Sequence, residues 1–273
     1  MSLRDLFLNG GGIPVIDSHG HLGPFNAIYM PEAKLEAMIA GMDRCGVESI
    51  ILSPHAALWG DIREGNREML DAVNRFPGRV YGYCAVNPNY PQDVPGELDA
   101  YLDQPGVVGI KIHPSSHECP VTDERYRPVW ERAQDLKLML LSHTWGRDGG
   151  CGSTDMRPVA EKYPEVRLLL GHSCYNDWDG AIALAVEFPH VYLELTAAYH
   201  AYGLIERMCR EAGSEKVLFG TDYPWFDPMV TIGCVTYAHI EEPEMRNILY
   251  NNARRLLDEQ LARDAGQGLP NPA

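Results

Sequence analysis

Three histidines and one aspartate have the spacing and types expected of a metal site. His19 and His21 form an H-x-H pair in Val-Ile-Asp-Ser-His-Gly-His-Leu, and two residues spaced by one along an extended strand point to the same side. His143 ends the segment Leu-Ser-His, and Asp222 stands in Gly-Thr-Asp-Tyr-Pro. Neutral imidazole and carboxylate are typical ligands of zinc-like ions. We therefore predict one divalent ion at these four side chains, zinc in the first place and manganese as the alternative.

Eight strands are predicted to position these residues. Short runs rich in leucine or β-branched residues alternate with segments of helical periodicity, which is typical of parallel βα units. The predicted strands cover 13–18, 49–53, 80–86, 107–112, 138–142, 167–171, 191–195 and 217–221. The predicted helices lie near 31–45, 64–76, 94–103, 123–136, 154–163, 178–187, 201–212, 226–239 and 243–262, with Pro31 and Pro243 at the first position of two of them.

The number and near-even spacing of the strands favour a closed barrel over an open sheet. No Gly-rich phosphate loop follows the first strand, as it would in a dinucleotide-binding sheet. We therefore predict an α/β fold, a single-domain (β/α)8 TIM barrel over residues 1–263, followed by a disordered tail over 264–273. In such a barrel the residues after the carboxyl ends of the strands converge, so His19, His21, His143 and Asp222 should meet.

Composition restricts the partners of this chain. The 273 residues carry a formal net charge of -15, which disfavours nucleic acid and anionic membranes because both would repel an acidic surface. The sequence contains no run of about 18 apolar residues, so no membrane helix is predicted. The N-terminal segment lacks the apolar region of a secretory signal. Seven scattered cysteines without a C-x-x-C pair are typical of reduced thiols. We expect a cytoplasmic protein that acts on a small molecule.

These motifs together resemble the amidohydrolase superfamily. The segments that carry the resemblance are Val-Ile-Asp-Ser-His-Gly-His-Leu, Gly-Ile-Lys-Ile-His-Pro, Leu-Ser-His, Leu-Gly-His-Ser and Gly-Thr-Asp-Tyr-Pro. Among its branches the chain is most similar to the amidohydrolase-2 group, which includes aminocarboxymuconate-semialdehyde-decarboxylase-like enzymes and sugar-lactone hydrolases. The resemblance implies a (β/α)8 barrel, usually with zinc at His19, His21, His143 and Asp222, and a further histidine, His172, near the metal. It also favours association into homodimers.

Catalytic roles are predicted for Asp222 and His172. A bound ion would acidify its water and polarise a substrate carbonyl. Asp222 would then take the proton of that water, and His172 would stabilise an oxyanion or exchange protons with the substrate.

Several further residues are candidates for substrate binding. Lys111 and His113 share the inward face of the fourth strand, and three aromatic rings follow strand ends: Trp145, Tyr223 and Trp225. Lys111 could instead be carboxylated and bridge two ions, as in some amidohydrolase branches. We regard a contact with the substrate carboxylate, or a structural role, as the better interpretation. His55, in the loop after the second strand, is interpreted as a solvated residue.

The leading functional prediction is hydrolysis of a C–O or C–N bond in a small cyclic or carboxylated molecule, such as a lactone, ester or amide, by a metal-activated water. The alternative is non-oxidative decarboxylation on the same barrel. A third hypothesis, of another class, is a non-catalytic barrel that keeps the ion for stability, in which protein ligands would fill every position on the metal.

Overall fold

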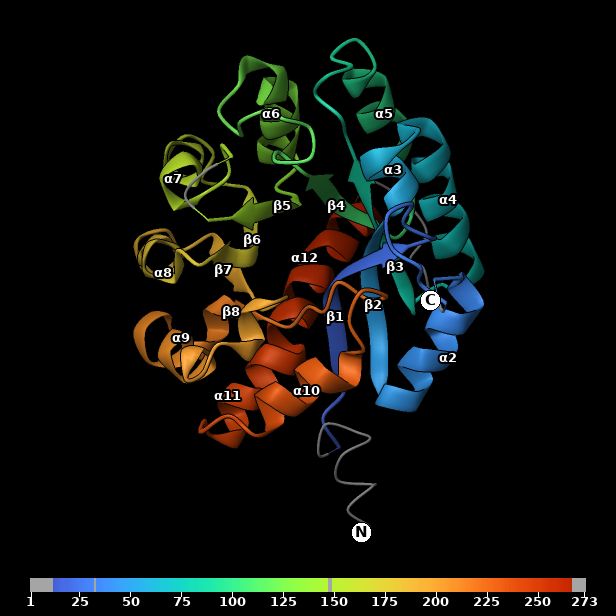
Figure 1. The fold of residues 1–273 in the computed structure, drawn as a ribbon. Helices are drawn as coiled ribbons and strands as arrows, with labels where there is room; N and C mark the ends of the chain where they lie inside the picture. Colours follow the sequence, from blue (N-terminus) through green and yellow to red (C-terminus); the bar gives the residue numbers. More distant parts are fainter. Residues whose placement is uncertain (1–11, 32, 147–148, 267–273) are drawn as a thin grey trace.

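Eight parallel strands form the centre of the molecule. The computed structural model describes residues 12–31, 33–146 and 149–266. The strands follow one another around the sheet in chain order, each pairing in parallel with the next. They are β1 (Val15–Leu22), β2 (Val47–Pro54), β3 (Val80–Ala85), β4 (Val107–Ile112), β5 (Met139–Trp145), β6 (Arg167–Tyr175), β7 (Val191–Glu194) and β8 (Val217–Leu218). Helices surround them (Figure 1), which confirms the predicted single-domain (β/α)8 barrel.

Backbone hydrogen bonds between the segment after β8 and β1 close the barrel. The amide of Ser18 donates to the carbonyl of Phe219 at 3.0 Å, and the amide of His21 donates to the carbonyl of Tyr223 at 2.7 Å. In return the amide of Asp222 donates to the carbonyl of His19 at 2.8 Å. This closure brings Asp222 beside His19, although 203 positions separate them in the chain.

The helices largely follow the predicted pattern. They are α2 (Leu35–Cys45), α3 (His55–Trp59), α4 (Ile62–Arg75), α5 (Val94–Tyr101), α6 (Arg127–Asp135), α7 (Ser153–Lys162), α8 (Trp178–Glu187), α9 (Leu204–Ala212), α10 (Pro228–Thr236), α11 (Glu242–Arg246) and α12 (Asn252–Gly266). A π-helical segment, Asn247–Asn251, joins the last two.

Several helix boundaries differ from those predicted, and the predicted helix over 243–262 is divided into α11, the π-helical segment and α12. Helix α2 begins at Leu35 rather than at Pro31, because a backbone hydrogen bond from Gly23 to Ala33 holds the chain in a loop up to that point. Pro243 is the second residue of α11 instead of the first. Helix α12 continues through residues 264–266, where we expected a disordered tail; the remainder of that tail, 267–273, lies outside the described residues.

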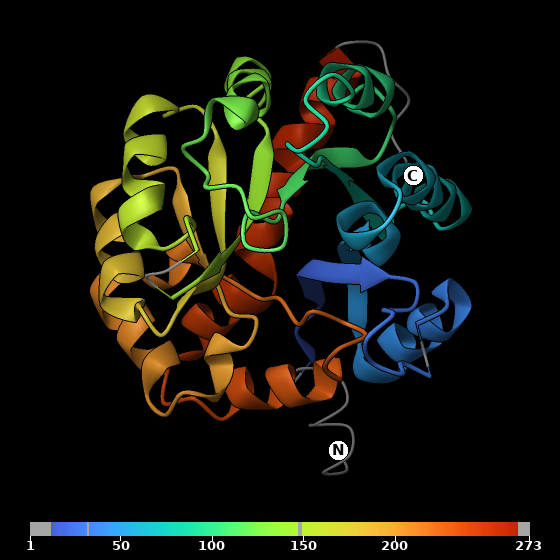
Figure 2. The ribbon, with the colours of Figure 1, turned by 45° about the horizontal axis from the view of Figure 1, so that its top comes forward.

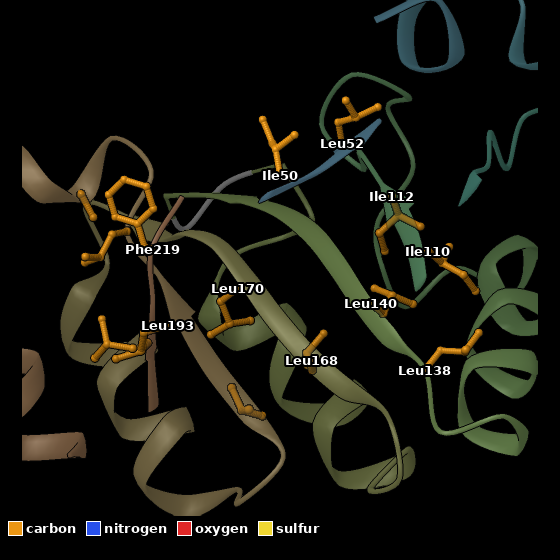
Figure 3. Packing of buried hydrophobic residues seen from close by; sticks show 14 of the residues in the cluster. Ile50, Leu52, Ile110, Ile112, Leu138, Leu140, Leu168, Leu170, Leu193 and Phe219 are labelled. Carbon is orange, nitrogen blue, oxygen red and sulfur yellow. The ribbon is translucent and has the colours of Figure 1, made fainter. Parts of the chain in front are cut away.

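Strand alternation sorts the apolar side chains into two cores. One set faces the helices, as Figure 3 shows for Ile110, Ile112, Leu138, Leu140, Leu168 and Leu170. The other set fills the barrel interior and includes Ile16, Ile51, Leu141, Leu169 and Leu218. Leu256 and Leu257 of α12 pack against this interior set, and Figure 2 shows α12, in red, behind the strands. The amino-terminal end is thus filled by apolar side chains, which leaves the carboxyl end for polar chemistry.

None of the helices in the described ranges 12–31, 33–146 and 149–266 is long and apolar enough to cross a membrane. All seven cysteines are free, and six of them are buried.

Candidate active site

A cluster of metal-binding side chains lies where β1 meets the segment after β8. The Nε2 atoms of His19 and His21 lie 3.1 Å and 3.2 Å from the same oxygen, Oδ1 of Asp222. Each of the three residues offers a ligand atom, and these atoms all lie within 4.8 Å of one another. Three of the four predicted ligands are therefore together, drawn from opposite ends of the chain.

Hydrogen bonds on the far side of each ring fix which nitrogen can bind a metal. The Nδ1 atom of His19 lies 2.8 Å from Oε2 of Glu194, and Nδ1 of His21 lies 3.0 Å from the carbonyl of Ser53. Both partners are acceptors, so each Nδ1 carries the hydrogen and donates it. The lone pair of each ring is therefore on Nε2, on the side of Asp222. This arrangement of an imidazole between an acceptor and a metal is typical of metalloprotein sites.

The protonation states of the cluster fit a divalent cation. Burial, together with the nearby charge of Lys111, holds the pKa of His19 well below its usual value, so the ring is neutral. Burial alone would raise the pKa of Asp222, but His19, His172 and His21 hold it well below its usual range. The neutral imidazole of His19 and the ionised carboxylate of Asp222, together with the imidazole of His21, form the kind of donor set that Zn²⁺ or Mn²⁺ binds.

Lys111 lies beside this cluster rather than in the open cavity. Its side chain is fully buried, and its ammonium group donates to Nε2 of His19 at 2.8 Å. Burial lowers the pKa of Lys111 to about 8. Lys111 is not among the residues that line the open cavity, so its predicted contact with a substrate carboxylate is not available from the cavity wall. The lone pair that Lys111 engages is the one that a metal ion would take.

The tight turn after β8 aims the Asp222 carboxylate. Asp222 has a φ of 60°, a left-handed conformation that is costly for a residue with a side chain. Oγ1 of Thr221 accepts from the amide of Tyr223 at 2.9 Å and donates to Oδ2 of Asp17 at 2.5 Å. Oδ1 of Asp17 in turn accepts from the amide of His19 at 3.1 Å. Asp17, missed as a site residue from sequence, therefore ties the β1 and β8 ends together.

His143 does not join the cluster directly, which differs from the prediction. Its Nδ1 lies 3.0 Å from Nε2 of His172, and its ring stacks on that of His113 with 3.9 Å between centroids. His172 stands between it and the cluster, with Nδ1 4.0 Å from Oδ2 of Asp222. That Nδ1 is buried and has no hydrogen-bond partner among the described residues. It is thus available to a ligand or a substrate.

Aromatic rings surround the cavity that opens above the cluster. This cavity has a volume of about 280 Å³ and is lined by His21, Trp59, His113, His143, Trp145, His172, Ala197, Asp222, Trp225 and Phe226. Trp145 stacks on Tyr175 with 4.1 Å between ring centroids and only 16° between the planes. Three predicted substrate-binding residues, His113, Trp145 and Trp225, do line the cavity. The opening leaves the cluster accessible, whereas a purely structural ion would be enclosed by protein ligands.

Tyr223, another predicted substrate residue, lies elsewhere. Its side chain belongs to the hydrophobic core outside the barrel, where its hydroxyl packs so closely on Gly41 of α2 that a Cβ at that position would collide with it. The left-handed conformation at Asp222 reverses the direction of the chain, so Tyr223 turns toward α2 while Asp222 turns inward.

His55 is buried, which contradicts its interpretation as a solvated residue. Only 2% of it is exposed. Its Nδ1 donates to the carbonyl of Gly23 at 2.7 Å, and its Nε2 accepts from Nε1 of Trp225 at 2.8 Å. The ring also stacks on His21 with 4.9 Å between centroids. His55 thus links the β1 loop to Trp225 in the cavity wall.

Glu194 is the main residue that sequence reasoning missed. It ends β7, and its carboxylate is fully buried. Burial raises its pKa, although the neighbouring His172 and the hydrogen bonds from Thr196 oppose that shift. The signal was present: a glutamate closes a short apolar strand at the same end of the barrel as the histidines.

The fold and this site together define a class of protein. A (β/α)8 barrel with imidazoles and a carboxylate converging at the carboxyl ends of its strands, open to a cavity, is a metal-dependent barrel enzyme. Comparison with known families gives the particular one. A family model described as Amidohydrolase (Amidohydro_2) matches residues 16–258, so the chain belongs to this amidohydrolase family.

Individual relatives are distant but span the whole barrel. A gamma-resorcylate decarboxylase of Polaromonas sp. (strain JS666) is 22% identical over 278 residues, covering 83% of this chain and 84% of that protein. An uncharacterised TIM-barrel protein of Bordetella bronchiseptica superposes with a TM-score of 0.75 at 17% identity, over 91% of this chain and 99% of that one. The 5-carboxyvanillate decarboxylase of Novosphingobium aromaticivorans, solved with manganese, superposes with a TM-score of 0.74 at 16% identity, over 94% of this chain and 100% of that one. At such identities the two solved structures show a shared fold.

The comparisons contradict the leading prediction of hydrolysis. The curated relatives are decarboxylases, so the alternative that we derived from the same residues has the better support. The ligand set did not separate the two reactions, because a metal-bound carboxylate or carbonyl serves both.

Proposed function

We propose that this enzyme is a metal-dependent decarboxylase of small planar aromatic carboxylic acids, acting without an oxidant. The observation that carries the proposal is the position of the aromatic cavity directly above the cluster of His19, His21 and Asp222. The gamma-resorcylate and 5-carboxyvanillate decarboxylases that resemble this chain act on substrates of that kind.

The cavity wall supports binding of a flat ring. Trp59 and Trp145 are 37% and 42% exposed, although large aromatic side chains are usually buried. Trp145 is held in place by its stacking on Tyr175, and His55 holds Trp225 through a hydrogen bond. Rigid rings at fixed positions favour a planar ligand, because little conformational entropy is lost on stacking.

The reaction requires that a carboxylate leave as CO2 and that a proton replace it. The bond from the substrate carbon to the carboxyl carbon breaks, and its electron pair remains on the substrate carbon, which then takes a proton. A divalent ion at His19, His21 and Asp222 would supply Lewis-acid stabilisation of the negative charge that develops. We assign the proton to Nδ1 of His172, a cavity-lining residue in which this atom is buried and has no hydrogen-bond partner among the described residues. Asp222, 4.0 Å away, stabilises the proton there.

His172 is neutral before this step. Burial lowers its pKa to about 4, although the nearby Asp222 opposes the shift, and donation from the neutral ring would leave an imidazolate. The ring must therefore first take a proton from solvent on Nδ1, which it then passes to the substrate carbon. When Nε2 of His172 donates to Nδ1 of His143 at 3.0 Å, Nδ1 of His172 keeps the lone pair that accepts this proton, so His143 would act by fixing this tautomer.

For the metal we propose one ion, manganese or zinc. The solved 5-carboxyvanillate decarboxylase contains manganese, and the imidazole-carboxylate set accepts both. A cytoplasmic location and association into homodimers also remain proposals; the seven free cysteines agree with the first. Sedimentation or gel filtration of the metal-loaded protein tests the second.

Activity assays can decide between decarboxylation and hydrolysis. The protein, purified without metal and then loaded with manganese or zinc, is incubated with 2,6-dihydroxybenzoate, 5-carboxyvanillate, lactones and amides. We expect one CO2 for each acid consumed, loss of activity on chelation, and, in D2O, a product with one deuterium at the carbon that lost CO2. Opening of a lactone or amide without any CO2 from the acids would overturn the proposal.

A further inference from the structure

We propose that Glu194 is a positioning residue of the metal centre, which sets the ring of His19 and the backbone of His172 through one carboxylate. The inference rests on the metal site of the proposed function but is independent of the reaction catalysed there. Glu194 ends β7 and is fully buried, and in the described chain no lysine or arginine forms an ion pair with it. A buried carboxylate in that position costs stability unless hydrogen bonds compensate.

Four hydrogen bonds compensate, and every one of them is donated to Glu194. Oε1 accepts from the amide and the hydroxyl of Thr196, both at 2.6 Å. Oε2 accepts from Nδ1 of His19 at 2.8 Å and from the amide of His172 at 3.1 Å. An ionised carboxylate, which only accepts, satisfies this set. A glutamine side chain would place its NH2 group, itself a donor, against one pair of these donors. The site therefore requires the negative charge of the glutamate as well as its shape.

The first consequence concerns His19. Because Nδ1 donates to Glu194, the lone pair of the neutral ring is on Nε2, which lies 3.1 Å from Asp222. Lys111 confirms this tautomer independently, since its ammonium group has no lone pair and must donate to Nε2. A carboxylate on the distal nitrogen also makes the imidazole a more basic metal ligand. His21 has neutral groups of Ser53 in the same position, the carbonyl at 3.0 Å and the hydroxyl at 3.4 Å.

The second consequence concerns His172. Its φ is 66°, which is unfavourable for a residue with a side chain unless contacts hold it. The oxygen that accepts from His19 also accepts from the His172 amide. One atom of Glu194 therefore couples the end of β1 to the end of β6 and keeps His172 beside Asp222.

A glycine that follows the neighbouring strand, β8, supplies an independent observation. Gly220, just after β8, has no Cβ, and a Cβ there would collide with Oε1 of Glu194 and lie 2.9 Å from Cβ of His19. The space that a side chain would occupy is thus taken by the Glu194 carboxylate.

Metal binding, measured without reference to turnover, tests this inference. The dissociation constant for Mn²⁺ or Zn²⁺ is measured by chelator competition for the wild type, Glu194→Gln and Ser173→Ala. Ser173 is a matched control, because its hydroxyl donates to the backbone carbonyl of Glu194 at 2.8 Å and does not touch the carboxylate. We expect about 10- to 100-fold weaker binding for Glu194→Gln and less than about threefold for Ser173→Ala. Wild-type affinity in a folded Glu194→Gln protein would contradict the role.

The tautomer of His19 in the metal-free wild type gives a second readout that needs no variant. Nitrogen-15 NMR should show the hydrogen of His19 on Nδ1, with exchange slowed by burial. A hydrogen on Nε2 would overturn the inference even if Glu194→Gln fails to fold. A wild type that binds neither metal would instead contradict the proposed function, while the tautomer measurement would still decide the role of Glu194.

Discussion

Acidification should destabilise the metal-free protein through His55, a residue outside the metal cluster. Burial, with a contribution from the neighbouring His21, lowers the pKa of His55 to about 3. The hydrogen bonds give a structural reason. Nδ1 already donates to Gly23, and Nε2 must stay unprotonated to accept from Trp225 at 2.8 Å. A second proton on the ring would break the contact that holds Trp225.

The magnitude follows from linkage between protonation and folding. The unfolded chain takes up this proton near pH 6.5, the usual value for histidine, whereas the native ring does so near pH 3. Between these limits the unfolded state binds more protons, so stability is complete above pH 6.5 and falls as the pH decreases. At about 1.36 kcal/mol per pH unit, the contribution of His55 should fall by about 2 kcal/mol between pH 7 and pH 5.

Urea denaturation of chelator-treated protein at pH 7, 6 and 5 measures this effect. His55→Gln removes the titrating group, so its stability deficit relative to the wild type should shrink by about 2 kcal/mol at pH 5. His239, whose ring is exposed, is the matched control, and His239→Gln should show a constant difference. A His55→Gln deficit that does not change between pH 7 and pH 5 would refute the reasoning.

Three further predictions concern the cavity and its support. Trp145→Ala should weaken binding of a planar aromatic acid up to about tenfold, since one stacking partner is lost; unchanged binding by calorimetry would remove Trp145 from the binding wall. His172→Asn should lower kcat by at least about 100-fold with a smaller effect on metal affinity. Single-turnover CO2 release at the wild-type rate, or a loss of metal affinity larger than the loss of rate, would contradict this role. Gly41→Ala should cost about 1–3 kcal/mol of stability, because its methyl group would collide with the Tyr223 hydroxyl; a urea midpoint equal to that of the wild type would argue against this packing.

The sequence by itself determined the barrel and the centre of the site. Alternation of strand and helix patterns is local information, and so is the spacing of His19 and His21 by one residue, which places both rings on one side of β1. Because all eight strands run parallel, their carboxyl ends must meet, so Asp222 could be placed beside His19 without coordinates.

Only the tertiary structure decided how side chains beyond the strand ends point. The left-handed φ values of His172 and Asp222 turn one ring toward the cluster and send Tyr223 to the outer core, and no local pattern specifies them. Glu194 and His55 gained their positions from contacts across strands that lie far apart in the chain. The burial and charge of these two side chains depend on those neighbours, so the residue pattern along a single strand could not predict them.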